Sequence, residues 1–96
     1  MLEPIKLGCV VYSKQGRDKG KYFAVVKVEE DFVYIADGEL RPLKKAKKKN
    51  IKHIKATGAV LECIAEKLLL NKKIYDAELR SALREFNDRE GIDGEK

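Results

Sequence analysis

The hydrophobic period of the chain changes near residue 57, and this change constrains the fold more than any other feature. Before it, short runs rich in Val, Ile, Tyr and Phe alternate with polar segments that contain glycine, which is typical of strands joined by turns. After it, apolar residues recur at three- and four-residue steps, which is typical of amphipathic helices. The 96 residues suffice for one modest core. We therefore expect a single, mainly β domain with a helical appendage.

The first part of the chain predicts four strands. Asp37 and Gly38 form a strong tight-turn dipeptide, because glycine tolerates positive φ. Pro42 cannot donate a ladder hydrogen bond, so the strand that contains it should be short and lie at an edge. Four short strands, each with one buried face, favour a small curled barrel over a flat sheet. The expected strands cover residues 8–13, 21–29, 32–37 and 39–43.

Two further features of this half concern the core and the closure of the barrel. Residues 51–55 fit a fifth, closing strand with a bulge, and they fit a helical turn equally well, because Ile51 and Ile54 are three positions apart. In the second strand, the better core face contains Tyr22, Ala24, Val26 and Val28.

The second part predicts two helices. Thr57 is the expected N-cap of the first helix and Asn71 its stop. The second helix begins near Asp76, another N-cap candidate. A connection of four or five residues should let the two helices pack as a hairpin. One stripe of the second helix contains Leu79, Leu83 and Phe86, with Arg80, Arg84 and Glu85 outside it.

These patterns divide the chain into three parts. Residues 1–57 form the barrel and include a basic segment at 41–55, and residues 58–87 form the two-helix appendage. Residues 88–96 contain two glycines, several charges and one isoleucine. We expect this last part to be a disordered tail.

Charge is distributed very unevenly along the chain. Charged residues make up 39% of the sequence, compared with roughly 25% in an average soluble domain. The net charge is +5, and the basic excess lies in residues 41–55, which hold eight Lys and Arg and no Asp or Glu. A dense positive patch on a nearly neutral body attracts a polyanion, and nucleic acid is the commonest one.

A resemblance to a known family follows from residues 8–28, where a strand, a basic loop with glycines and a second strand resemble the KOW motif. This motif occurs in ribosomal proteins and transcription elongation factors. IADG at 35–38, Arg41 and KKKNIKHIKAT at 47–57 resemble the large-subunit ribosomal proteins of archaea and eukaryotes that carry a KOW barrel, and small bacterial RNA-binding proteins similar to them. The resemblance covers about residues 7–57. It implies an SH3-like barrel that binds ribosomal RNA, partly through its first loop.

The candidate RNA-binding residues come from the loop at 14–21 and from the basic segment, which ends at Lys55. Lysine is a flexible point charge that meets phosphate oxygens without demanding one geometry. Arg17 can grip a phosphate in a bidentate fork or stack on a base. The loop equally fits an ordinary hairpin turn, and His53 equally fits a structural residue that caps the barrel. The candidates are Lys14, Arg17, Lys19, Lys21, Arg41, Lys44, Lys45, Lys47, Lys48, Lys49, Lys52 and His53.

The sequence gives little support for catalysis, metal binding or base stacking. No nucleophile elbow, phosphate-binding loop or HExxH motif is present, so we expect no enzyme, no cofactor and no small-molecule substrate. One histidine and two distant cysteines give no metal-ligand spacing, and we expect Cys9 and Cys63 to be buried as small hydrophobic residues. Aromatic residues that alternate in strands are more often core or sheet surface than a stacking platform for bases. Those in question are Tyr12, Tyr22, Phe32 and Tyr34.

The expected function is binding of ribosomal RNA by a ribosome-associated protein. The N-terminus lacks the apolar run of a signal peptide, and no stretch is long enough to span a membrane, so we expect a cytoplasmic protein. Two alternatives stay open: a protein-interaction module, and a transcription-elongation partner that docks on polymerase. The helical appendage is a further docking surface if residues such as Leu69, Leu70 or Ile74 are exposed.

Overall fold

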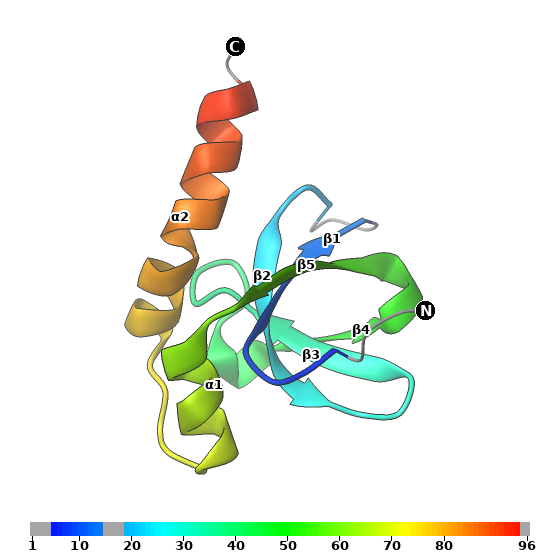
Figure 1. Ribbon diagram of the computed structural model, residues 1–96, viewed down its shortest axis with the longest axis vertical. Coiled ribbons are helices and arrows are strands. Elements are labelled where there is room, and N and C mark those ends of the chain that lie inside the picture. Colours follow the sequence, from blue (N-terminus) through cyan, green and yellow to red (C-terminus); the bar gives the residue numbers. More distant parts are fainter. Residues whose placement is uncertain (1–4, 15–18, 95–96) are drawn as a thin grey trace.

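The computed structural model describes residues 5–14 and 19–94, with side chains up to Asn87. It contains a five-stranded antiparallel sheet and two helices (Figure 1), so the expected combination of a mainly β chain with two helices is confirmed. Two short 3-10 turns lie between strands, η1 (Leu43–Lys45) and η2 (Ile51–His53). The strands are β1 (Cys9–Ser13), β2 (Tyr22–Val28), β3 (Phe32–Ala36), β4 (Lys47–Asn50) and β5 (Ile54–Val60), and the helices are α1 (Glu62–Leu69) and α2 (Asp76–Gly94).

The sheet has the strand order β4-β3-β2-β1-β5. The first four strands form a meander, and β5 returns to pair with β1. The sheet is strongly curved, and α1 and α2 lie on one side of it (Figure 1). Among the described residues β4 and β5 are the two edges and do not pair with each other, so the sheet is not closed.

Both faces of the sheet are buried over its centre, which gives the protein two layers of core. Successive residues of a strand point to opposite faces. The inner layer lies within the curve of the sheet, and the outer layer lies between the sheet and the helices. The inner layer contains Val11, Phe23, Val25, Val33, Ile35 and Ile54, and the outer layer contains Val10, Ala24, Ala36, Ile64, Leu79 and Leu83.

The prediction of a single core face for β2 is wrong, because residues on both faces of this strand are buried. Phe23 and Val25, assigned to the other face by the sequence, are fully buried in the inner layer. Ala24 is fully buried in the outer layer, but Val28 is 43% exposed. The alternation of apolar and polar residues along a strand can identify only one buried face. In this protein the helices bury the second face of β2 as well.

The fourth strand is β4 (Lys47–Asn50), so the prediction of a strand over residues 39–43 is wrong. The Asp37 side chain accepts hydrogen bonds from the backbone N–H groups of Glu39 (2.9 Å) and Arg41 (2.8 Å), which holds these residues in a turn. Gly38 has the positive φ of +81° that the turn prediction required. Lysines disfavour strands in propensity scales, so the run in β4 gave no strand signal.

Residues 51–55 combine the two alternatives that the sequence left open. The side chain of Asn50 accepts a hydrogen bond from the backbone N–H of Lys52 (2.8 Å) and starts η2. The chain then enters β5 at Ile54, and this strand continues to Val60.

The expected start of the first helix at Thr57 is wrong, because this residue belongs to β5. Its hydroxyl donates to the carbonyl of Val10 (2.8 Å) and accepts from the N–H of Ala59 (3.1 Å). Gly58 has φ +88° and lies where the register between β1 and β5 shifts, as in a β-bulge. Helix α1 therefore begins only at Glu62. The stop at Asn71 is confirmed by its left-handed φ of 59°.

Helix α2 begins at Asp76 as expected, and it packs its predicted stripe on the sheet. Asp76 is not the N-cap, because it is already helical: the carbonyl of Tyr75 accepts from the N–H of Leu79 (3.1 Å), and the Asp76 carboxylate accepts from Leu43. Leu79 and Leu83 are buried, and Phe86 is half-buried beside them. The helix continues to Gly94 and so includes residues 88–94, for which the sequence predicted disorder. Extending a helix that is already formed costs far less than starting one, which accounts for the difference. Residues 95–96 lie outside the described residues.

The cysteines differ from each other in their surroundings. Cys9 is half-buried at the start of β1 and Cys63 is exposed on α1, so neither cysteine is buried as expected. Within the described part of the chain, neither helix is long and apolar enough to cross a membrane.

Candidate nucleic-acid interface

Pairing of β1 with β5 brings the two predicted RNA-binding segments together at one end of the sheet. Ser13 lies opposite Ile54 in this pairing. One residue further on, the N–H of Lys14 donates to the carbonyl of His53 (3.0 Å). Ser13 also donates its N–H to the carbonyl of Lys21 (3.0 Å), which closes the hairpin between β1 and β2. The first loop and the end of the basic segment therefore lie side by side.

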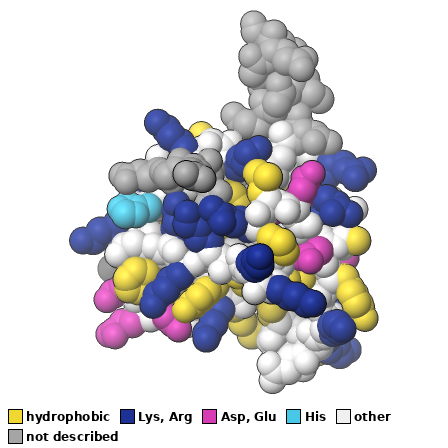
Figure 2. Space-filling view, turned by 180° about the vertical axis from the view of Figure 1, so that it is seen from behind, with side chains coloured by type: hydrophobic (Ala, Val, Ile, Leu, Met, Phe, Trp, Pro, Cys, Tyr) yellow, Lys and Arg dark blue, Asp and Glu magenta, His cyan; other side chains and the backbone are white. Residues whose placement is uncertain are grey.

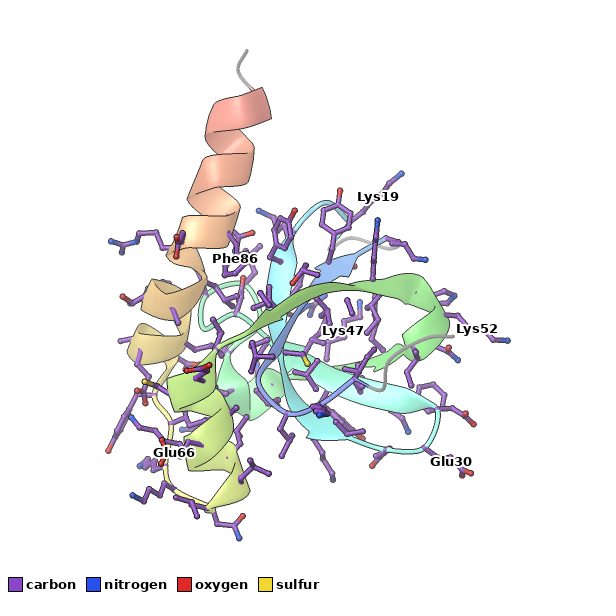
Figure 3. The ribbon with its side chains drawn as sticks, in the orientation of Figure 1. Lys19, Glu30, Lys47, Lys52, Glu66 and Phe86 are labelled. Carbon is purple, nitrogen blue, oxygen red and sulfur yellow. The ribbon has the colours of Figure 1, made fainter. Side chains whose placement is uncertain are left out.

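We call this end of the sheet the lysine rim, which consists of Lys14, Lys19, Lys21, Lys52, Lys55 and His53. Its five lysines are exposed and form no ion pair with any residue that the structure describes, and His53 is half-buried. Figure 3 shows Lys19 and Lys52 extending outward from the sheet. In Figure 2 the single histidine has Lys and Arg side chains on both sides. Such uncompensated charges, gathered at one end of the sheet, create a positive potential that attracts anions.

The beginning of the basic segment lies elsewhere. Lys44 and Lys45 are exposed on η1, and Arg41 is half-buried just before it. The N–H of Leu43 donates to the carboxylate of Asp76 (2.7 Å), which holds η1 against the first turn of α2. Strand β4 separates these three cations from the lysine rim. The structure therefore divides the predicted basic segment into two regions.

The lysines of β4 point to both faces of the sheet. Lys47 and Lys49 lie opposite Ile35 and Val33, which face the inner core layer, and Lys49 is only 7% exposed. Figure 3 shows Lys47 within the curve of the sheet. Lys48 points outward and is exposed. Three lysines that are consecutive in sequence therefore do not present one continuous charged surface.

Lys48 is also engaged by neighbouring side chains. Its Nζ lies 4.6 Å from the centroid of the Phe32 ring and 3.7 Å from Oε1 of Glu29. The ammonium of Lys27 is placed over Tyr34 in the same way, 5.3 Å from the ring centroid. One face of Phe32 and one face of Tyr34 are therefore each occupied by a lysine of the protein itself.

Tyr12 and Tyr22 form a separate aromatic pair beside the lysine rim. Their ring centroids are 5.1 Å apart, with a tilt of 59°. Lys55, on the neighbouring strand, lies directly opposite Tyr12. The four aromatic residues considered in the sequence are thus split into two pairs, and no spacing rule in the sequence marks the pair that lies next to cations.

Arg17 lies outside the described residues. Within the described residues, no three His, Cys, Asp or Glu side chains are close enough to hold a metal ion together. No known protein-family model matches the sequence.

Proposed function

We propose that the chain is an RNA-binding protein built on a KOW-type, SH3-like barrel, which contacts the phosphate backbone of RNA through the lysine rim. The observation that carries this proposal is the hydrogen bond between Lys14 and His53. It joins the hairpin loop and the end of the basic segment into one surface, although neither segment alone holds all the exposed cations.

The sheet supports the barrel part of the proposal. Its strands form a meander whose fifth member returns to the first, and its inner face encloses a core drawn from β1, β2, β3 and β5. The 3-10 turn η2 redirects the chain from β4 on one edge to β5 on the other. A short antiparallel sheet curled around one core layer is the arrangement expected of a small barrel.

The chemistry of the lysine rim supports contact with phosphate groups. Lysine meets phosphate as a point charge, so binding through it positions a nucleic acid without reading its sequence. No bond is made or broken, and the sheet contributes by fixing the spacing of the cations. If all five lysines contact phosphates, log K should fall with log salt with a slope of roughly −3.5 to −4.5, at about 0.7 to 0.9 per contact.

The choice of ribosomal RNA as the target rests on the resemblance of residues 35–57 to ribosomal proteins. Crosslinking of the protein to RNA in cells, followed by sequencing, tests this choice. Dominant recovery of ribosomal RNA is the expected result. Dominant recovery of messenger or transfer RNA would refute this choice, and copurification of the protein with polymerase instead of ribosomes would favour the transcription-elongation alternative.

Removing charge from the rim tests the mechanism. The triple variant K14Q/K52Q/K55Q should weaken binding to different RNAs about equally, and should make the salt slope shallower by roughly 2 to 3, because three phosphate contacts are lost. Fluorescence anisotropy at several salt concentrations measures both quantities.

A matched control removes two exposed lysines from the connection between α1 and α2. The variant K72Q/K73Q loses charge far from the rim in sequence and should keep most of the affinity and the salt slope. Losses of affinity and of salt slope in proportion to the charges removed, two against three, would show that only net charge matters. Weak salt dependence of the unmodified protein would favour a protein-interaction module.

A further inference from the structure

The aromatic pair Tyr12 and Tyr22 lies on the outer face of the sheet, at the end where the lysine rim begins. The two residues are direct neighbours across β1 and β2. The flanking hydrogen bond from Ser13 to Lys21 makes them a non-hydrogen-bonded pair, in which side chains approach most closely. Phe86 of α2 packs on the far side of Tyr22, with ring centroids 5.8 Å apart. Tyr12 is therefore the outer member of a row of three rings.

A shallow pocket of about 370 Å³ opens beside this row. Two tyrosines and the exposed side chain of Lys55 contribute to its lining. The nearest atom that a side chain at Gly20 would meet is the Tyr12 hydroxyl, 3.9 Å from the Cβ position, so the glycine leaves the tip of this ring uncrowded. The pocket is lined by Tyr12, Tyr22, Lys55, Ala56 and Thr57.

We infer that this pocket holds one unpaired RNA base, which stacks on Tyr12 while Lys55 contacts a neighbouring phosphate. The inference rests on the proposed function and adds a second mode of contact to it. Lys55 belongs to both the pocket and the lysine rim, so a strand whose phosphates follow the rim passes the pocket. The base must come from a loop, a bulge or a single strand, because paired bases do not expose their faces.

The composition of the pocket predicts stacking without base selection. The Thr57 hydroxyl already donates to Val10 and accepts from Ala59. The remaining side chains are Ala56, Lys55 and two tyrosines, whose hydroxyls lie at the ring tips. Stacking on aromatic rings is tolerant of sequence, since every base has a π-face. The pocket therefore distinguishes single-stranded from duplex RNA rather than one sequence from another.

Binding of single-stranded and duplex RNA of equal length, at one salt concentration, tests the inference. Y12L should weaken single-strand binding by about 5- to 150-fold, as expected for loss of one stacked base, and should leave duplex binding unchanged. Y12F keeps the ring and should bind both RNAs like the unmodified protein. Equal losses on both RNAs, or no loss on either, would overturn the inference.

Two further results keep this test separate from that of the proposed function. If the unmodified protein binds neither RNA, the proposed function fails as well. If it binds both with steep salt dependence and Y12L changes nothing, only the stacking pocket fails. Should Y12L not fold, photocrosslinking of the unmodified protein to RNA with 4-thiouridine decides. Crosslinks to Tyr12 or Tyr22 would support the pocket, and crosslinks confined to residues outside the pocket, such as Lys14 or Lys52 of the rim, would refute it.

Discussion

Asn87 completes the backbone hydrogen bonding of β2 where β3 has ended. The last pair between these strands joins Ala24 and Ala36, so Tyr22 extends beyond its neighbour. The amide of Asn87 takes the place of the missing strand: its Oδ1 accepts from the N–H of Tyr22 (3.0 Å), and its Nδ2 donates to the carbonyl of Tyr22 (3.3 Å). One side chain therefore ties α2 to the sheet by two hydrogen bonds.

Substitution of Asn87 should reveal the cost of leaving these groups unpaired. N87L should lower the free energy of unfolding by about 1 to 3 kcal/mol, because a partly buried N–H and C=O lose their partners. Urea denaturation measures this change. R84L, at an exposed position one turn earlier, serves as the control and should have little effect. Equal effects of the two variants would contradict this role of Asn87.

An ion pair between α1 and α2 provides a pH-dependent contribution to stability. Nζ of Lys67 lies 2.7 Å from Oε2 of Glu78, and Oε1 of Glu78 accepts the N–H of Tyr75 (3.1 Å). The hydrogen bond from Lys67, followed by that from Tyr75, lowers the pKa of Glu78 below its usual 4.5. The hydrogen bond to Glu78 raises the pKa of Lys67 above its usual 10.5.

These shifts fix the pH range in which the pair stabilises the fold. A lowered carboxyl pKa stabilises the protein above about pH 4.5, and this contribution disappears as the pH falls through the folded-state pKa. The unmodified protein should therefore have a higher Tm than E78Q at pH 7, and the difference should shrink in acid. Thermal unfolding from pH 7 to pH 2 measures it, with E66Q, at an exposed position on α1, as the control. A difference that is independent of pH would refute this origin.

At the scale of elements, α1 is fixed against the start of β1 by Gly8. This residue donates its N–H to Val25 (2.8 Å) and accepts from the N–H of Leu61 (2.9 Å), just before the helix begins. A Cβ at this position would overlap the side chain of Ala65, and φ is +83°. The absence of a side chain therefore allows the helix to approach the strand.

G8A should consequently destabilise the protein by two effects. Overpacking against Ala65 costs roughly 1 to 3 kcal/mol, and the left-handed backbone adds roughly 1 to 2 kcal/mol. G58A is a matched control, because its φ is +88° and nothing lies within 4 Å of the added Cβ, so it should show only the backbone cost. The second substitution A65G should restore part of the stability of G8A, measured by chemical denaturation. Because the backbone of Ala65 also lies close to the added Cβ, the comparison with G58A decides: equal losses in G8A and G58A would argue against the steric cause.

The elements that sequence patterns predicted are those whose residues act locally. Asn71 ends α1 by its own backbone conformation, and Asp37 with Gly38 forms its turn within a few residues. The prediction of Thr57 as a helix N-cap is wrong because its hydroxyl donates a hydrogen bond to Val10, which is distant in the sequence, and no local pattern encodes this contact. Strand β4 was missed for a similar reason, since its lysines become a strand by pairing with β3.

For the candidate site, too, the sequence predicted the local features but not their arrangement in space. The run of lysines was evident in the sequence, and so was the basic loop. Which lysines share a surface depends on the pairing of β1 with β5 and on the alternation within β4. Lys49 is consequently buried, whereas Lys55, the last residue of the basic segment, lies on the rim.

At the scale of the whole molecule, the helices and the sheet share the outer core layer. Leu79 and Leu83 of α2 are buried against Val10 and Ala24 of the sheet. This shared layer predicts that the barrel and its appendage unfold together. L79A should cost about 2 to 5 kcal/mol and should reduce the protection of amides in β2 as well as in α2.

Hydrogen exchange of L79A, read at individual amides, measures this coupling. L69A removes a leucine that is 70% exposed and should leave both regions protected. Loss of protection in α2 alone, or two separate thermal transitions, would show that the sheet is stable without its appendage.

The placement of three successive lysines in β4 also affects how copies of the chain meet. Among the described residues this strand is an edge of the sheet, with β3 as its neighbour. An edge strand can serve as a template to which a further strand adds. If a second copy paired through the same edge, its β4 lysines would face the β4 lysines of the first copy. Like charges that face each other across two strands repel. We therefore expect Lys48, the exposed lysine of this edge, to oppose self-association, and a neutral residue in its place to favour aggregation even if RNA binding is unaffected.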